Sequence, residues 1–145
     1  MTTRRSAPSL RATRVDREVA VLLRWFDRVD YDDVARDWVL VHDYPLPEGF
    51  NKPSTPVLML IPADYPQVPP DGLFVDRGLN IPGHYFQGHG GRNPFGDKDW
   101  AWLCAHLARR GWQPSADVTN GDNLLTLMGL YATIFAEMLG RRRGR

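Results

Sequence analysis

The chain has 145 residues, 43% of them hydrophobic, and a formal net charge of +1. This length allows one domain with a core of its own, and the near-neutral charge argues against a general nucleic-acid binder. No stretch approaches the roughly 18 consecutive apolar residues that a membrane-spanning helix requires. Because the arginines gather at both ends, we expect a flexible basic tail at residues 1–14, one domain at 15–140 and a second basic tail at 141–145.

The first predicted element is an amphipathic helix. Its apolar residues recur at helical spacing between Val15 and Arg28. Two segments rich in β-branched and aromatic residues then predict strands at 37–44 and 55–61. These strands are close enough in sequence to pair as an antiparallel meander.

A proline-rich segment follows the second strand. Residues 62–70 contain four prolines, and proline fixes φ and removes a backbone donor, so we expect a stiff, extended connector. A short third strand is predicted at 73–76. Residues 77–99 hold six glycines and predict a long irregular loop. Loops of this length inside a compact domain usually carry function.

The last predicted element is a helix from about Asn123 to Leu139. Its apolar residues recur at helical spacing, with Asp122 in the position of a cap and Gly140 in the position of a terminator. The order of helix, antiparallel meander, long loop and helix predicts an α+β fold, with helices covering one face or end of the sheet.

Cys104 is the only cysteine of the chain. It cannot form an internal disulfide, so it is a small buried hydrophobe, a metal ligand or a nucleophile. Zinc would require His84, His89 and His106 beside it, but Cys-x-His is not the usual zinc spacing, so we predict no metal. A single cysteine without a secretory signal also points to the reducing cytoplasm.

The motifs around Cys104 resemble those of ubiquitin-conjugating enzymes, the UBC superfamily. Tyr65-Pro-Gln-Val-Pro-Pro70 looks like the family's Tyr-Pro-x-x-Pro-Pro signature, which also follows a meander. Trp112-Gln-Pro114 is similar to the Trp-x-Pro that follows the active cysteine and precedes a closing helix. The segments 45–51 and 111–118 further resemble a bacterial branch, the prokaryotic ubiquitin-conjugating family E.

The resemblance implies a UBC-like fold and an acyl-carrier function. Cys104 would accept the C-terminal carboxyl of a ubiquitin-like protein, as a thioester, from an adenylating activating enzyme, and would pass it to an amine of a protein target. A thiol suits this step, because the thiolate is the nucleophile and a thioester stays reactive toward amines. The resemblance implies no cofactor for this enzyme itself, and the hydropathy and net charge lead us to expect no membrane or nucleic-acid partner. It also suggests a role in bacterial defence against phage.

The chain departs from the family beside the cysteine. The His-Pro-Asn motif of eukaryotic members, whose Asn supports acyl transfer, is absent, and Asn93 and His89 are the nearest candidates. The bacterial branch often has serine where this chain has Cys104. A serine would carry the acyl group as an oxyester, whereas the cysteine of this chain predicts a thioester. His106 shares a face with Cys104 if the segment is extended but not if it is helical. We predict Cys104, His106 and Asn93 as catalytic residues.

Two other functions fit parts of the sequence. A UBC-fold module that has lost catalysis would bind a ubiquitin-like protein without covalent chemistry, in keeping with the missing motif. A thiol hydrolase would use Cys104 and His106, but it needs a third group to hold the base, and none is identifiable. Trp100 and Trp102 flank the cysteine at alternate positions, where they either shield a thioester from water or only pack.

Overall fold

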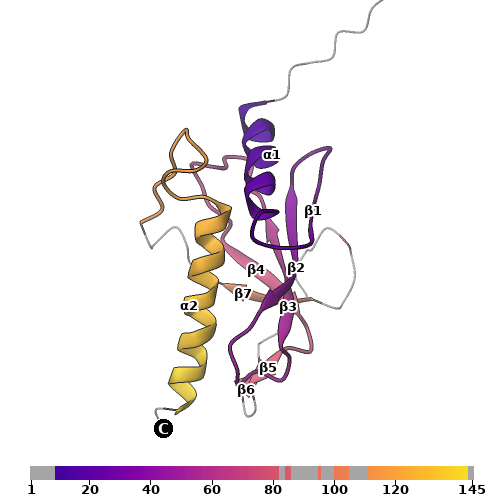
Figure 1. Cartoon of the computed structure of the whole chain (residues 1–145), viewed down its shortest axis with the longest axis vertical. Helices are drawn as coiled ribbons and strands as arrows, with labels where there is room; N and C mark the ends of the chain where they lie inside the picture. The colour runs from indigo at the N-terminus through magenta and orange to yellow at the C-terminus, as the bar shows by residue number, and fades with distance from the viewer. Residues whose placement is uncertain (1–8, 82–83, 86–94, 96–99, 105–110, 144–145) are drawn as a thin grey trace, which may run out of the picture.

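The protein is built around a five-stranded antiparallel sheet, on which helices from the two ends of the chain pack (Figure 1). The structure, a computed structural model, describes residues 9–81, 84–85, 95, 100–104 and 111–143. The predicted α+β fold, with an N-terminal helix, an antiparallel meander and a C-terminal helix, is confirmed. The sheet order is β1-β2-β3-β4-β7, and β5 and β6 form a separate two-stranded ribbon. The elements are α1 (Leu10–Leu22), β1 (Val29–Tyr31), β2 (Trp38–Pro45), β3 (Ser54–Leu60), β4 (Gly72–Asp76), β5 (Asn80–Ile81), β6 (His84–Tyr85), β7 (Trp100–Cys104) and α2 (Leu124–Arg143).

The main core lies between one face of the sheet and the two helices. Alternate strand residues supply one side of it, and the helical repeats of α1 and α2 supply the other. Its buried residues include Val15, Val19 and Leu22 of α1, Val39, Val41, Val57, Met59, Leu73 and Val75 of the sheet, and Leu124, Leu127, Met128, Tyr131 and Phe135 of α2. Full burial of one such side chain contributes about 1.5–3 kcal/mol. Each helix supplies several of these side chains, so both helices are needed to close the core.

The opposite face of the sheet carries a second apolar cluster, which we call the outer cluster. Leu40, Leu58 and Phe74 are its buried centre, and Trp38, Leu60, Trp100 and Trp102 pack around them. The strand register aligns Leu40, Leu58, Phe74 and Trp102 in one row across the sheet. Neither helix contributes to this cluster, so the described sheet buries apolar side chains on both faces.

The first helix begins and ends earlier than predicted. It spans Leu10–Leu22, because the Ser9 hydroxyl caps it by accepting the Ala12 N–H at 3.0 Å. Residues 10–14, expected in the basic tail, are therefore helical. The apolar repeat misled at the other end, since Phe26 packs against the main core from beyond the helix. The outer boundaries of the domain stay a prediction.

The last helix is longer than predicted and has a different cap. The side-chain oxygen of Asn123, not that of Asp122, accepts the free N–H of Thr126 at 2.8 Å. Asp122 instead accepts the Gln113 N–H at 2.7 Å. Gly140 does not end α2, which continues to Arg143, because this glycine keeps a negative φ and not the left-handed conformation of a C-terminal cap.

The three predicted strands are observed as β2, β3 and β4, shifted by at most one residue, and β2 and β3 pair antiparallel as expected. The proline-rich connector between β3 and β4 is not extended as predicted. Residues 63–67 form turns, in which Tyr65 N–H donates to Pro62 and Val68 N–H donates to Asp64. The Tyr65–Pro66 peptide bond is cis. We call residues 63–67 the Tyr-Pro turn.

Four strands were not predicted: β1, β5, β6 and β7. The strand β1 is only three residues long and pairs with β2. The segment 77–99, expected as an irregular loop, includes the ribbon of β5 and β6. The strand β7 follows it and pairs antiparallel with β4 along its whole length, from Asp76↔Trp100 to Gly72↔Cys104.

Candidate active site

Cys104 is the last residue of β7 and lies opposite Gly72 of β4. The segment before it is therefore extended, whereas the two alternatives for His106 concern residues 105–106, which lie outside the described residues. The residues of β7 alternate between the two faces of the sheet: Ala101 and Leu103 contact the main core, while Trp100 and Trp102 belong to the outer cluster. Among the described strands β7 is at the edge of the sheet, so Cys104 lies at the end of an edge strand.

Gly72 leaves no space for a side chain opposite Cys104. A Cβ atom built on Gly72 would clash with the carbonyl oxygen of Leu103 and would lie 2.7 Å from Cζ2 of Trp102. The backbone of β4 and the end of β7 thus approach each other at a point where only glycine fits. No sequence motif marked this residue; the only signal is a glycine at the start of a strand that is otherwise buried.

The structure does not describe the other two predicted catalytic residues, so it does not show whether they lie near Cys104. His106 and Asn93, like His89, lie outside the described residues, and His84 is described only as part of β6. Their grouping around Cys104 stays a prediction. In the described part of the chain, no three His, Cys, Asp or Glu residues are close enough to hold a metal ion.

A buried hydrogen-bond network lies beneath the Tyr-Pro turn. The Glu18 carboxylate, 2% exposed, accepts the Tyr65 hydroxyl at 2.7 and 2.6 Å to its two oxygens. It also accepts Nε of Arg14 at 2.8 Å and the first N–H of α2, that of Leu124, at 2.6 Å. Burial, followed by the charge of Glu18, raises the pKa of Tyr65, so its hydroxyl remains a donor.

The guanidinium group of Arg14 extends this network to the chain that leads into α2. It donates to the carbonyl oxygens of Ser115 and, at 3.3 Å, of Asp122. The carboxylate of Glu18 thus stands at the positive N-terminal end of α2 and is paired with a cation, which suits a buried acid. The signature tyrosine of the resemblance is a structural donor in this network. The sequence signal for Glu18 was present but not used: a charged residue within the apolar stripe Val15, Val19, Leu22.

The two aromatic motifs of the resemblance contact each other. Nε1 of Trp112 donates to the Pro66 carbonyl oxygen at 2.6 Å, and the rings of Trp112 and Tyr65 lie 6.3 Å apart. Trp112 also packs against the main core. Trp112, which follows β7 in the chain, therefore holds the Tyr-Pro turn by a hydrogen bond. The turn itself contacts α1 and the start of α2 through the carboxylate of Glu18.

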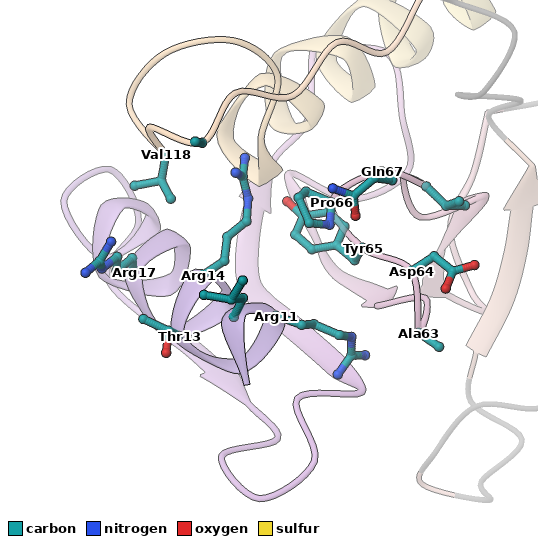
Figure 2. A pocket seen from close by; sticks show the side chains of 13 residues that line it. Arg11, Thr13, Arg14, Arg17, Ala63, Asp64, Tyr65, Pro66, Gln67 and Val118 are labelled. Carbon is teal, nitrogen blue, oxygen red and sulfur yellow. The ribbon is translucent and has the colours of Figure 1, made fainter. Parts of the chain in front are cut away.

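A hollow of about 700 Å³ lies between α1, the Tyr-Pro turn and residues 116–118 (Figure 2). Its lining is mainly apolar, including Leu10 and Val68, which are 92% and 43% exposed. Arg17 stands at its rim. An apolar hollow with exposed aliphatic side chains and a charged rim is typical of a contact surface for another protein. Trp102 and Leu103 of β7 do not line it, so the hollow is separate from the described end of β7.

Two buried tyrosines allow a test of the network. The Tyr131 hydroxyl is buried without a hydrogen-bond partner in the described residues, whereas that of Tyr65 donates to Glu18. We expect Tyr65→Phe to lower the free energy of unfolding by about 1.5–3 kcal/mol, the range for a bond to a charged group. The matched Tyr131→Phe should leave it unchanged or raise it by up to about 1 kcal/mol. Urea unfolding measures both; equal losses would contradict the network.

These features define the class of protein. An α+β fold with an N-terminal helix, an antiparallel meander, a Tyr-Pro turn, a cysteine at the end of the last strand and a closing helix is that of the ubiquitin-conjugating type. The family model of prokaryotic E2 family E matches residues 24–131, and the chain belongs to this family. No curated protein and no solved structure matches the chain significantly. Within the described helices, none is long and apolar enough to cross a membrane.

Proposed function

We propose that this prokaryotic E2-like protein is a conjugating enzyme that carries a ubiquitin-like protein as a thioester on Cys104. The observation that carries the proposal is the position of this residue. The chain's only cysteine ends an edge strand, is held against Gly72, and stands between the Tyr-Pro turn and Trp112 in the order of the chain. An acyl carrier requires a thiol on a rigid but accessible element, and β7 has one edge that no other described strand covers.

The chemistry has two steps. In the first, the thiolate of Cys104 attacks the carbonyl carbon of the acyl group that the adenylating enzyme holds in activated form, a C–S bond forms, and the bond from that carbonyl to its activating group breaks. In the second, an amine nitrogen of the target attacks the thioester carbonyl, a C–N bond forms, and the C–S bond breaks to return the thiolate. We assign His106 as the acceptor of the proton lost by the amine and Asn93 as a donor to the oxyanion.

The partners follow from these steps. The acyl donor is the activated C-terminus of a ubiquitin-like protein, the enzyme that delivers it is an adenylating enzyme, and the acceptor is an amine of a protein. The hollow beside α1 offers a surface on which a partner docks while the end of β7 stays clear for transfer. The cytoplasm is the compartment that keeps the thiol reduced. We place the reaction in a bacterial conjugation pathway that acts against phage.

The test is formation of the covalent adduct. With its adenylating enzyme, the ubiquitin-like protein and ATP, the wild type is expected to form an adduct that a thiol reductant releases. Cys104→Ala abolishes it, because no nucleophile remains. Cys104→Ser is expected to form a weaker adduct that resists the reductant and is released by alkali, because an oxyester replaces the thioester. Non-reducing gel electrophoresis measures all three, and thermal unfolding verifies that the variants fold.

The outcomes separate the competing functions. A wild type that binds the ubiquitin-like protein but forms no adduct with an active adenylating enzyme is a non-covalent binding module. Repeated release of an acyl reporter without an amine acceptor identifies a thiol hydrolase. An adduct that persists in Cys104→Ala would place the acyl group on another residue and end the proposal.

A further inference from the structure

Trp102 lies against the glycine that pairs with the candidate nucleophile. Its ring packs edge-on against Phe74, with the ring centroids 4.9 Å apart. The far end of the indole reaches beyond Phe74 to Gly72: Cζ2 and Cη2 lie 2.7 and 3.0 Å from the position that a Cβ atom on this glycine would occupy. Gly72 is the residue that pairs with Cys104. The six-membered ring of Trp102 therefore covers the cross-strand neighbour of Cys104.

Trp100 is similar in chemistry but stands elsewhere. It pairs with Asp76, at the opposite end of β7 from Cys104, and its ring lies 6.1 Å from that of Phe95. At about 3.3 Å of rise per residue, the backbone of Trp100 is roughly 13 Å from Cys104 and that of Trp102 roughly 7 Å. Both tryptophans are half-buried members of the outer cluster. They differ in which end of the strand they cover.

The alternation of β7 puts Trp102 and Cys104 at register positions of the same face. Residues two apart in a strand share a face, and Trp100 and Trp102 belong to the outer cluster while Ala101 and Leu103 belong to the main core. We propose that Trp102 is a specificity-determining residue of the thioester site: its indole forms an apolar wall beside Cys104 that shields the thioester from water. This inference rests on the proposed function of Cys104.

The indole wall affects how water and the target amine compete for the thioester carbonyl. In hydrolysis, a water oxygen attacks the thioester carbonyl, the C–S bond breaks, the acyl group leaves as a carboxylic acid, and the thiol is regenerated. In transfer, an amine makes the same attack and the acyl group leaves as an amide. A target amine is brought by a bound partner, whereas water approaches from every open side. An apolar surface on one side of the carbonyl therefore slows hydrolysis more than transfer.

The matched variants are Trp102→Phe and Trp100→Phe. Phenylalanine at position 102 keeps an aromatic ring against Phe74 but lacks the second ring, which covers Gly72. We expect the thioester of Trp102→Phe to hydrolyse several-fold faster than that of the wild type in buffer without an amine. Its rate of transfer to a saturating amine acceptor should stay near the wild-type rate. Trp100→Phe should leave both rates unchanged, because Trp100 covers the opposite end of β7.

A second measurement needs no partner protein. Because Cys104 is the only cysteine, alkylation of the protein by iodoacetamide reports on this thiol alone. We expect alkylation of the folded protein to be several-fold faster in Trp102→Phe than in the wild type or Trp100→Phe. Equal alkylation rates and equal thioester lifetimes in all three proteins would overturn the role of Trp102. Equal acceleration in both variants would do the same, since it would reflect general loosening of the outer cluster.

Different results would overturn the proposed function of Cys104 and the shielding role of Trp102. Absence of an adduct from the wild type itself overturns the proposed function, and the shielding role falls with it. A wild-type adduct whose lifetime does not depend on Trp102 overturns only the shielding role and leaves Cys104 as the acyl carrier.

Discussion

Replacement of Glu18 by alanine is expected to lower the free energy of unfolding by about 3–5 kcal/mol, the cost of removing one partner from a buried ion pair. Three donors would lose their acceptor at once: the Nε–H of Arg14, the Tyr65 hydroxyl and the Leu124 N–H. Each is buried or partly buried, so water replaces the carboxylate poorly. Because small domains are stable by only about 5–15 kcal/mol, this single change should bring the protein close to unfolding at ambient temperature.

A matched control is available at the surface. Asp37 also pairs with an arginine, Arg11 at 3.3 Å, but its side chain is 67% exposed. We expect Asp37→Ala to cost less than about 1 kcal/mol, as exposed ion pairs do. Urea unfolding followed by circular dichroism measures both variants. Similar midpoints for Glu18→Ala and Asp37→Ala would contradict the structural role assigned to the buried network.

Replacement of Gly72 by alanine is expected to destabilise the sheet and to impair Cys104 at the same time. The added methyl group meets the Leu103 carbonyl oxygen and the Trp102 ring, and the first of these belongs to the backbone and cannot rotate away. Overpacking of this kind costs about 1–3 kcal/mol. Since the displaced backbone is that of β7 next to Cys104, we expect adduct formation to fall further than the loss of folded protein explains.

Gly129 provides the control for this substitution. It lies inside α2, and a Cβ atom built on it meets nothing within 4 Å. Gly129→Ala should therefore raise the free energy of unfolding by about 0.5–1 kcal/mol through helix propensity, with adduct formation unchanged. Opposite signs for the two glycines are the expected result. A Gly72→Ala protein as stable and as active as the wild type would show that β7 tolerates displacement there.

The local parts of the fold could be predicted from the sequence, and the long-range parts could not. The strands β2, β3 and β4 were recognised because β-branched and apolar residues define them without reference to partners. The helices were recognised by periodicity, but their ends depend on individual hydrogen bonds, such as those of Ser9 and Asn123. The short strand β1 carries too few residues to give a pattern.

The candidate site shows the same division. Cys104 was found because the chain has no other cysteine and because ordered motifs surround it. The pairing of β7 with β4 was not found, since it joins segments that are far apart in sequence and depends on a glycine without a motif. The role of Glu18 was missed for the same reason: its contact with Leu124 spans 106 positions of the chain. The spacing of apolar residues within a short segment indicates neither the β4–β7 pairing nor the bond from Leu124 to Glu18.

The bond between Glu18 and the start of α2 has a consequence for synthesis of the protein. During translation, Glu18 emerges early, but the amide that it accepts belongs to residue 124. The main core also waits for α2, which supplies Tyr131 and Phe135. The nascent chain therefore carries an incomplete core, and Glu18 lacks one of its donors, until α2 has left the ribosome, so this domain cannot complete its fold from the residues before 124 alone.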